Sequence, residues 1–202
     1  MYGRFTDNNI KAQTPHIRGV SREKAYTIGL KNAGQYSLIS NNNIVSERGG
    51  FCVGLENTAP QVKISGNKIL ATHTVLGTTI LNAGTHTIID SNLILSTAKN
   101  CKLLEHKTND SIITSNIMMN TLRKSLAITG CGIYTLGKDA HHNIISYNII
   151  KDVLNCGIYC NLSDNTISSN EILSYSDSIQ KTTEPNLKFN KLFDENTVKS
   201  IK

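Results

Sequence analysis

The sequence predicts an all-β solenoid, in which short parallel strands stack coil upon coil. A phrase of the form apolar-x-x-Asn-x-apolar, seen in residues 89–94 (IDSNLI), recurs along the chain. Its asparagines are Asn8, Asn42, Asn67, Asn92, Asn116, Asn148, Asn170 and Asn190. The intervals between them are 34, 25, 25, 24, 32, 22 and 20 residues. No apolar stripe of helical period is sustained, and the short Ile-rich runs are punctuated by Asn, Gly and Ser, so strands rather than helices are indicated.

Two further sets of positions define the register of the coils. Twelve residues before four of the asparagines stand apolar residues, and ten before them stand polar ones: Leu30, Leu55, Ile80 and Leu104, then Asn32, Asn57, Asn82 and His106. Parallel strands stack at about 4.8 Å, so equivalent side-chain amides can hydrogen-bond from coil to coil. A ladder of Asn is therefore predicted, and His106 takes a structural place in the second row.

These repeats resemble a known family. Gly157-Ile158-Tyr159, followed by residues 165–170 (NTISSN), looks like the repeat of right-handed parallel β-helices, namely pectate-lyase-like folds, NosD-type repeats and bacteriophage tailspikes. The resemblance covers nearly the whole chain and implies a right-handed helix of about eight coils. It says less about activity, because one fold hosts many functions.

The chain is expected to form a single β-helix domain over residues 1–202. It opens in the middle of a coil, which suggests the C-terminal part of a longer chain or an N-terminal face covered by something else. Residues 11–25 are predicted to leave the coil as a loop insertion, and residues 187–202 to form a tapering C-terminal end.

The amino-acid composition limits the classes of molecule that the protein is expected to bind. The chain has 21 basic and 15 acidic residues, a net charge of +6, with aromatics at 5% and no Trp. This mild charge favours an acidic polymer, and no basic stripe interleaved with aromatics indicates nucleic acid. Neither a signal peptide nor an apolar run of about 18 residues is present, so no membrane partner is expected. The resemblance implies an extracellular or virion-surface location.

The five cysteines are an odd number without a close framework, which indicates thiols that are reduced at folding: Cys52, Cys101, Cys131, Cys156 and Cys160. Cys131 and Cys156 begin matching phrases one coil apart. They are predicted to be a stacked pair of buried thiols rather than a disulfide or a metal site.

One candidate site is a column of polar residues six before each Asn: Tyr36, Gln61, His86, Asp110, His142 and Asp164. His86, Asp110 and His142 are expected on three successive rungs of one outward face, with Asp90 beside them. A carboxylate between two imidazoles suits acid/base work or a divalent metal. The alternative is an exposed hydrogen-bonding ladder, and neither a metal nor a cofactor is predicted.

The other candidate site lies eleven residues before the Asn and contains Glu56 and Glu105, two rungs apart. Their backbones should be about 10 Å apart, and the carboxyls within the separation of about 6.5 to 9.5 Å used by inverting glycosidases. The alternative is a pair of ordinary solvated glutamates. The residues predicted to bind substrate are Lys31, Lys107, Lys138, Asp139 and Tyr36.

Two functions remain open. The first is a carbohydrate depolymerase, a glycoside hydrolase or lyase of tailspike or secreted type, acting on a polysaccharide laid across several coils. The second is a non-catalytic structural or carbohydrate-binding module of a tailspike or adhesin, for which the resemblance implies a homotrimer. No P-loop, GxSxG, HExxH or CxxC motif points elsewhere, and no catalytic residue is carried over from the pectate lyases.

Overall fold

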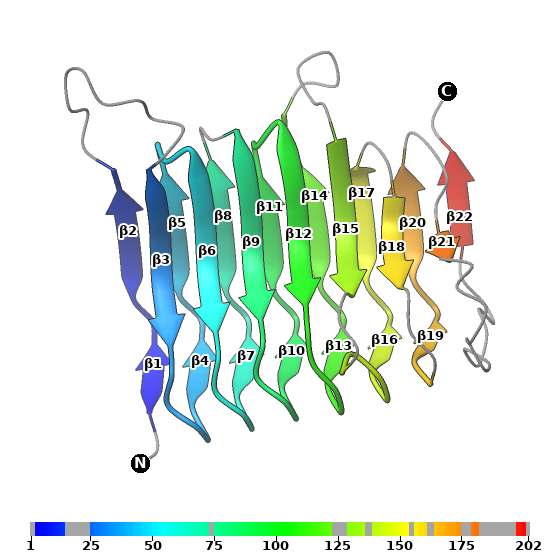
Figure 1. The fold of residues 1–202 in the computed structure, drawn as a ribbon, viewed down its shortest axis with the longest axis horizontal. Coiled ribbons are helices and arrows are strands. Elements are labelled where there is room, and N and C mark those ends of the chain that lie inside the picture. Colours follow the sequence, from blue (N-terminus) through cyan, green and yellow to red (C-terminus); the bar gives the residue numbers. More distant parts are fainter. Residues whose placement is uncertain are drawn as a thin grey trace.

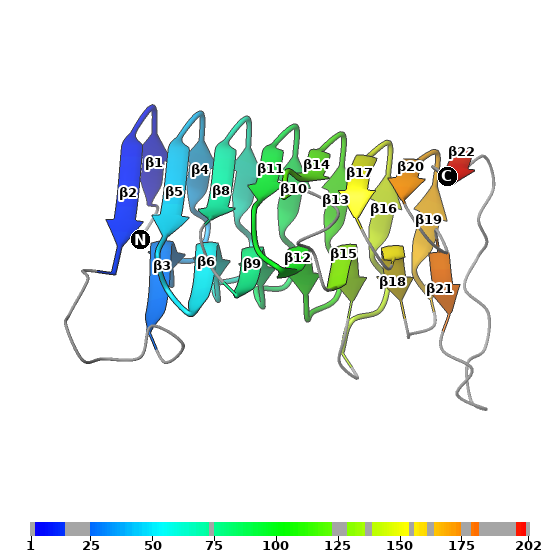
Figure 2. The same ribbon diagram turned by 90° about the horizontal axis from the view of Figure 1, so that it is seen from above.

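The computed structural model describes residues 3–14, 25–72, 75–122, 129–135, 139–153, 156–160, 164–174, 179–181 and 197–200. The chain winds into a stack of coils, and each full coil contributes one strand to each of three parallel sheets (Figure 1). One of the three sheets, called sheet C, runs along one side of the stack, and the other two, called sheets A and B, run along the other side (Figure 2). The described residues contain no helix, and so none that could cross a membrane.

The three sheets are built from equivalent strands of successive coils. Sheet A contains β1 (Arg4–Thr6), β4 (Leu38–Ser40), β7 (Lys63–Ser65), β10 (Ile88–Asp90), β13 (Ile112–Thr114), β16 (Ile144–Ser146) and β19 (Thr166–Ser168). Sheet B contains β2 (Asn9–Gln13), β5 (Asn43–Glu47), β8 (Lys68–Thr72), β11 (Leu93–Ser96), β14 (Ile117–Asn120), β17 (Ile149–Val153), β20 (Glu171–Ser174) and β22 (Thr197–Ser200). Sheet C contains β3 (Tyr26–Asn32), β6 (Phe51–Asn57), β9 (Leu76–Asn82), β12 (Asn100–His106), β15 (Thr129–Thr135), β18 (Cys156–Cys160) and β21 (Ile179–Lys181).

This architecture confirms the predicted right-handed parallel β-helix and its register. Leu30 pairs with Leu55, Leu55 with Ile80, and Ile80 with Leu104, as the spacing required. The core is a set of such apolar columns, one from each sheet, and its sheet A and sheet B members are almost all isoleucine. Branched aliphatic side chains suit a pleated, close-packed interior, and burying each one contributes about 1.5–3 kcal/mol.

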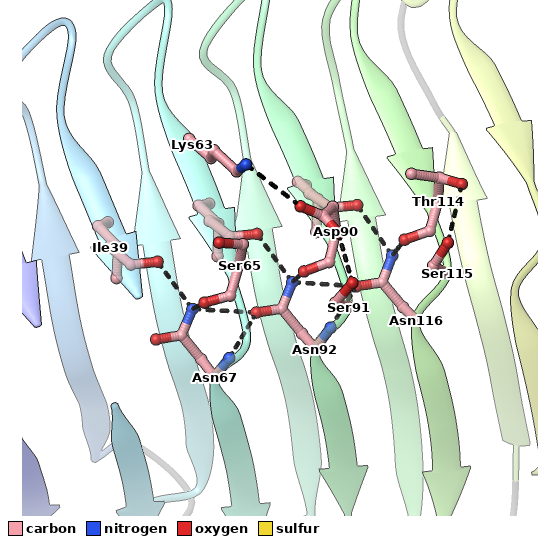
Figure 3. Close-up of polar contacts among 12 residues, drawn as sticks. Ile39, Lys63, Ser65, Asn67, Asp90, Ser91, Asn92, Thr114, Ser115 and Asn116 are labelled. Atoms are coloured by element: carbon pink, nitrogen blue, oxygen red, sulfur yellow. Dashed lines mark hydrogen bonds and ion pairs between the residues drawn. The ribbon is translucent and has the colours of Figure 1, made fainter. Parts of the chain in front are cut away.

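The predicted Asn ladder runs along the corner between sheets A and B (Figure 3). Asn92 donates through both its backbone N and its Nδ2 to Oδ1 of Asn116, each at 3.0 Å. Its Nδ2 also donates to the carbonyls of Ile64 at 2.9 Å and Asp90 at 3.0 Å. The same pattern links the ladder members Asn8, Asn42, Asn67, Asn92, Asn116, Asn148 and Asn170. Asn190 lies outside the described residues.

The ladder stabilises a sharp turn. The residue before each ladder Asn has a positive φ, for example 56° at Ser91 and 57° at Ser115. Residues other than glycine rarely adopt this left-handed backbone conformation, and the turn leaves backbone groups without sheet partners. The Asn amides bond those groups, so the turn and the ladder depend on each other.

A second, shorter ladder lies at the end of the sheet C strands and contains His106. Asn57 Nδ2 donates to Asn82 Oδ1 at 2.7 Å, and Asn82 Nδ2 lies 3.0 Å from His106 Nδ1. Because Nδ1 accepts, Nε2 carries the proton and donates to Asn143 Oδ1 at 3.1 Å. Burial lowers the pKa of His106 to about 4. The predicted structural place of His106 is confirmed.

The cysteines follow the register but not every detail of the prediction. All five are free thiols, and Cys131 pairs in register with Cys156. Cys131 is only half-buried, however, whereas its register partner Cys156 is buried. The hydrogen bond to Cys156, together with burial, raises the pKa of Cys131 well above its ordinary value, and burial raises that of Cys101 to about 12.

The predicted irregular segments are described only in part. β2 extends to Gln13, so the first residues of the predicted 11–25 insertion still belong to sheet B, and residues 15–24 lie outside the described part. In the predicted tapering end, β22 pairs with β20, and the rest of residues 187–202 lies outside the described part.

Candidate functional site

The outer face of sheet C carries the column that contains the two glutamates. Backbone pairing places six residues in register on successive strands: Lys31, Glu56, Leu81, Glu105, Tyr134 and Tyr159. Glu56 and Glu105 therefore stand two rungs apart with Leu81 between them, as the spacing predicted. Only 9% of Glu56 and 7% of Glu105 is exposed, so neither is an ordinary solvated surface glutamate.

Lysines surround both carboxylates. Lys31 Nζ lies 2.9 Å from Glu56 Oε1, and the hydrogen bond with Glu56 raises the pKa of Lys31. Glu105 Oε1 lies 3.0 Å from Lys102 Nζ and 3.3 Å from Lys107 Nζ. Two of the lysines predicted to bind substrate thus contact the glutamates, whereas the third contact, Lys102, was not predicted.

Aromatic rings extend this surface on both sides. Tyr134 and Tyr159 stack with ring centroids 4.8 Å apart, and Lys102 Nζ lies 4.1 Å from the centroid of Tyr134. Nearer the N-terminus, Tyr26 and Phe51 stack at 4.9 Å. Stacked rings on neighbouring rungs form flat apolar strips with polar hydroxyl ends.

A hollow of about 380 Å³ opens over β6, β9 and β12. It is lined by Phe51, Leu76, Gly77, Thr78, Asn100, Cys101, Lys102 and Glu105. Burial is the main cause of the raised pKa of Tyr26, followed by the charge of Glu56. Burial also raises the pKa of Tyr134, followed by the charge of Glu105. The phenols and the glutamates therefore share one partly desolvated surface.

The second candidate column turns out to lie in a corner. Tyr36, His86, Asp110 and His142 all have positive φ values, between 53° and 57°, so they form the turn that leads into sheet A. They point outward as predicted, but as turn residues and not as members of a strand face.

Within this corner, Asp110 does lie between two imidazoles. Its Oδ2 is 3.8 Å from His86 Nε2 and its Oδ1 is 3.6 Å from His142 Nδ1. The side chains of both histidines are 59% exposed. Among the described residues, no three His, Cys, Asp or Glu side chains are grouped to hold a metal ion. The arrangement is an open polar ladder, and His141 Nδ1 lies within hydrogen-bond distance of His142 Nδ1, at 3.1 Å.

The remaining predicted residues lie away from the glutamates or cannot be placed. Asp90 Oδ1 accepts a hydrogen bond from Ser91 Oγ, and Asp90 Oδ2 lies 3.6 Å from Lys63 Nζ on sheet A. Tyr36 belongs to the corner, Asp139 is exposed in the turn after β15, and Lys138 lies outside the described residues.

Comparisons with protein-family models, curated proteins and solved structures give no match to this chain. The class to which it belongs, the parallel β-helix, therefore rests on its own repeat and register.

Proposed function

We propose that the protein binds a polysaccharide along the outer face of sheet C and hydrolyses it between Glu56 and Glu105, as a depolymerase of tailspike or secreted type. The observation that carries this proposal is the hollow over β6, β9 and β12, which has Glu105, Phe51 and Lys102 in its lining, with Lys102 also in contact with the ring of Tyr134. Elongated polymers suit such a face, because the same surface repeats from rung to rung.

The two glutamates supply the chemistry. In inverting hydrolysis one carboxyl group protonates the leaving oxygen, and the other activates water from about 6.5 to 9.5 Å away. A two-rung spacing, roughly 10 Å between backbones, is compatible with that separation. One of the two glutamates acts as the acid and the other as the base; Glu105 lies beside two lysine ammonium groups and Glu56 beside one. Lys31 and Lys107 orient an acidic sugar.

The test is to incubate the protein with acidic and neutral polysaccharides and to follow new reducing ends. The Glu105→Gln and Glu56→Gln proteins should each lose activity about 10²-fold or more, since each lacks a proton-transfer group. Glu47→Gln is the matched control: Glu47 is also 9% exposed and also lies 2.9 Å from a lysine, Lys11, but stands on sheet B. That protein should keep full activity.

Two results would contradict this mechanism. Unsaturated uronate products would identify a lyase. Loss of activity in His86→Ala or Asp110→Asn, with both glutamine variants active, would move the chemistry to the corner.

A non-catalytic carbohydrate-binding module is the second candidate, and one observation favours it: both glutamates are buried beneath the lysines that contact them. In that case no polymer gives product. Binding then survives Glu105→Gln and is lost in Phe51→Ala, and a tailspike-like module would be a homotrimer.

A further inference from the structure

Apolar side chains gather on the outer face of sheet B. Ile44, Ile69 and Ile94 point into the core, so the residues on either side of each point outward. One outward column contains Asn43, Lys68, Leu93, Ile117, Ile149 and Glu171. The next contains Val45, Leu70, Leu95, Met119, Lys151 and Leu173. We call the part of these columns from β8 to β20 the sheet B face.

Most of the apolar side chains of this face keep part of their surface exposed. Ile117, at its centre, is 42% exposed, and Leu70, Leu93, Leu95, Met119 and Ile149 are half-buried. From the strand spacing and the rise per residue, the columns run roughly 20 Å along the solenoid axis and lie roughly 7 Å apart.

The rim of the face is polar. On one side Thr72 and Thr97 join their hydroxyls at 2.6 Å, and on the other lies the Asn corner with its left-handed residues. Along the solenoid axis, the first column ends in Lys68 on β8 and Glu171 on β20. Within the described part of the chain, neither side chain lies in an ion pair.

The order of residues along both columns is complementary to its own reverse. Counting outward from β14, Lys68 corresponds to Glu171, Leu93 to Ile149, and Leu70 to Leu173. Ile117 and Met119 correspond to themselves. Lys151 corresponds to Leu95, and its methylene groups can cover a leucine while the ammonium reaches the rim.

We propose that a second copy of this chain packs on the sheet B face, with a two-fold axis that lies over β14, midway between the two sheets, and runs parallel to the strands. A two-fold interface brings one patch against itself, so only a surface complementary to its own reverse fits. In this dimer the solenoid axes are antiparallel and the two sheets stack at about 10 Å. Ile117 and Met119 meet their own copies, and two Lys68–Glu171 ion pairs close the ends. The sheet C face stays open, so this inference is independent of the proposed carbohydrate site.

Sedimentation equilibrium of the full chain over a range of concentrations tests the proposal. Because the face is small for a stable interface, we expect a concentration-dependent dimer with a dissociation constant of about 1–100 μM. Ile117→Lys should abolish it, since two ammonium groups would face each other across the axis. Ile112→Lys is the matched control, because Ile112 is 37% exposed on the neighbouring sheet A. Circular dichroism checks that both proteins fold.

A charge exchange tests the geometry. Lys68→Glu alone and Glu171→Lys alone should each raise the dissociation constant about tenfold, because each sets like charges opposite one another twice. The double exchange should restore the wild-type value. In any parallel arrangement, including a cyclic trimer, each position faces its own rung, and the double exchange restores nothing. That result, or a monomer at every concentration up to about 1 mM, would overturn the proposal.

Discussion

Replacement of Asn92 by alanine should lower the free energy of unfolding by about 3 kcal/mol or more, because it leaves several buried backbone and amide groups without hydrogen-bond partners. The Asn92 side chain accepts from the N and Nδ2 of Asn67 and donates to Asn116 Oδ1 and to the carbonyls of Ile64 and Asp90. Asn92 is 2% exposed, so water cannot replace these bonds without opening the corner. Urea unfolding followed by circular dichroism measures the loss, and the Asn67 amide should lose protection from hydrogen exchange.

Asn8→Ala is the matched control, since Asn8 makes the same ladder contact to Asn42 from an exposed position. It should cost only about 1 kcal/mol or less. Equal losses in the two proteins would show that the ladder contributes no more where it is buried than where it is wet.

Acidification should destabilise the fold between pH 6.5 and pH 4 through His106. Burial lowers the pKa of this imidazole from 6.5 to about 4, so in that window the unfolded chain binds a proton that the folded chain refuses. Stability is therefore fully present above the unfolded pKa and is lost as the pH falls towards the folded one. The total is of the order of 3 kcal/mol, at about 1.4 kcal/mol per pKa unit.

The His106→Asn protein isolates this effect from the other titrating groups. Asparagine fills the equivalent place in the neighbouring rungs and can bond Asn82 without binding a proton. Unfolding free energies of both proteins, measured from pH 7.5 to pH 4, should be similar at neutral pH and diverge towards pH 4, because only the wild-type protein loses the contribution of His106. Parallel curves would mean that His106 does not stay neutral in the folded state.

The register was predictable because one residue type makes it. An Asn whose amide bonds the next Asn must recur at the same point of every coil, so Asn67, Asn92 and Asn116 revealed the strand pairing through their spacing alone. The same count brought Glu56 and Glu105 onto one column.

Counting failed where a coil is longer. Tyr159 stands eleven residues before Asn170, on the glutamate column, but the longer turn before Asn148 moves Tyr134 out of that count. Only the alignment of residues 132–134 with residues 157–159 reveals the tyrosine stack. The ion pair of Lys102 with Glu105, and the hollow, depend on side-chain packing across rungs, which spacing does not encode.

The column that contains His86 and Asp110 shows a second reason why the site could not be predicted fully from the sequence. Polar residues such as His86 and Asp110 recur because a left-handed turn points them outward, and sequence position alone does not separate a turn from the end of a strand.

The Asn ladder also has a direction. In every rung the amide nitrogens donate to the oxygen of the following Asn, so the side-chain dipoles all point the same way along the axis and the row has two unlike ends. Within the described residues, Asn8 Oδ1 receives no such bond. Any strand layer added before β1 and β2 must therefore bring donors to that oxygen, and a layer offered in the reverse orientation would bring a second acceptor and be rejected. The direction of the amide row therefore allows a further coil to continue the ladder in one orientation only.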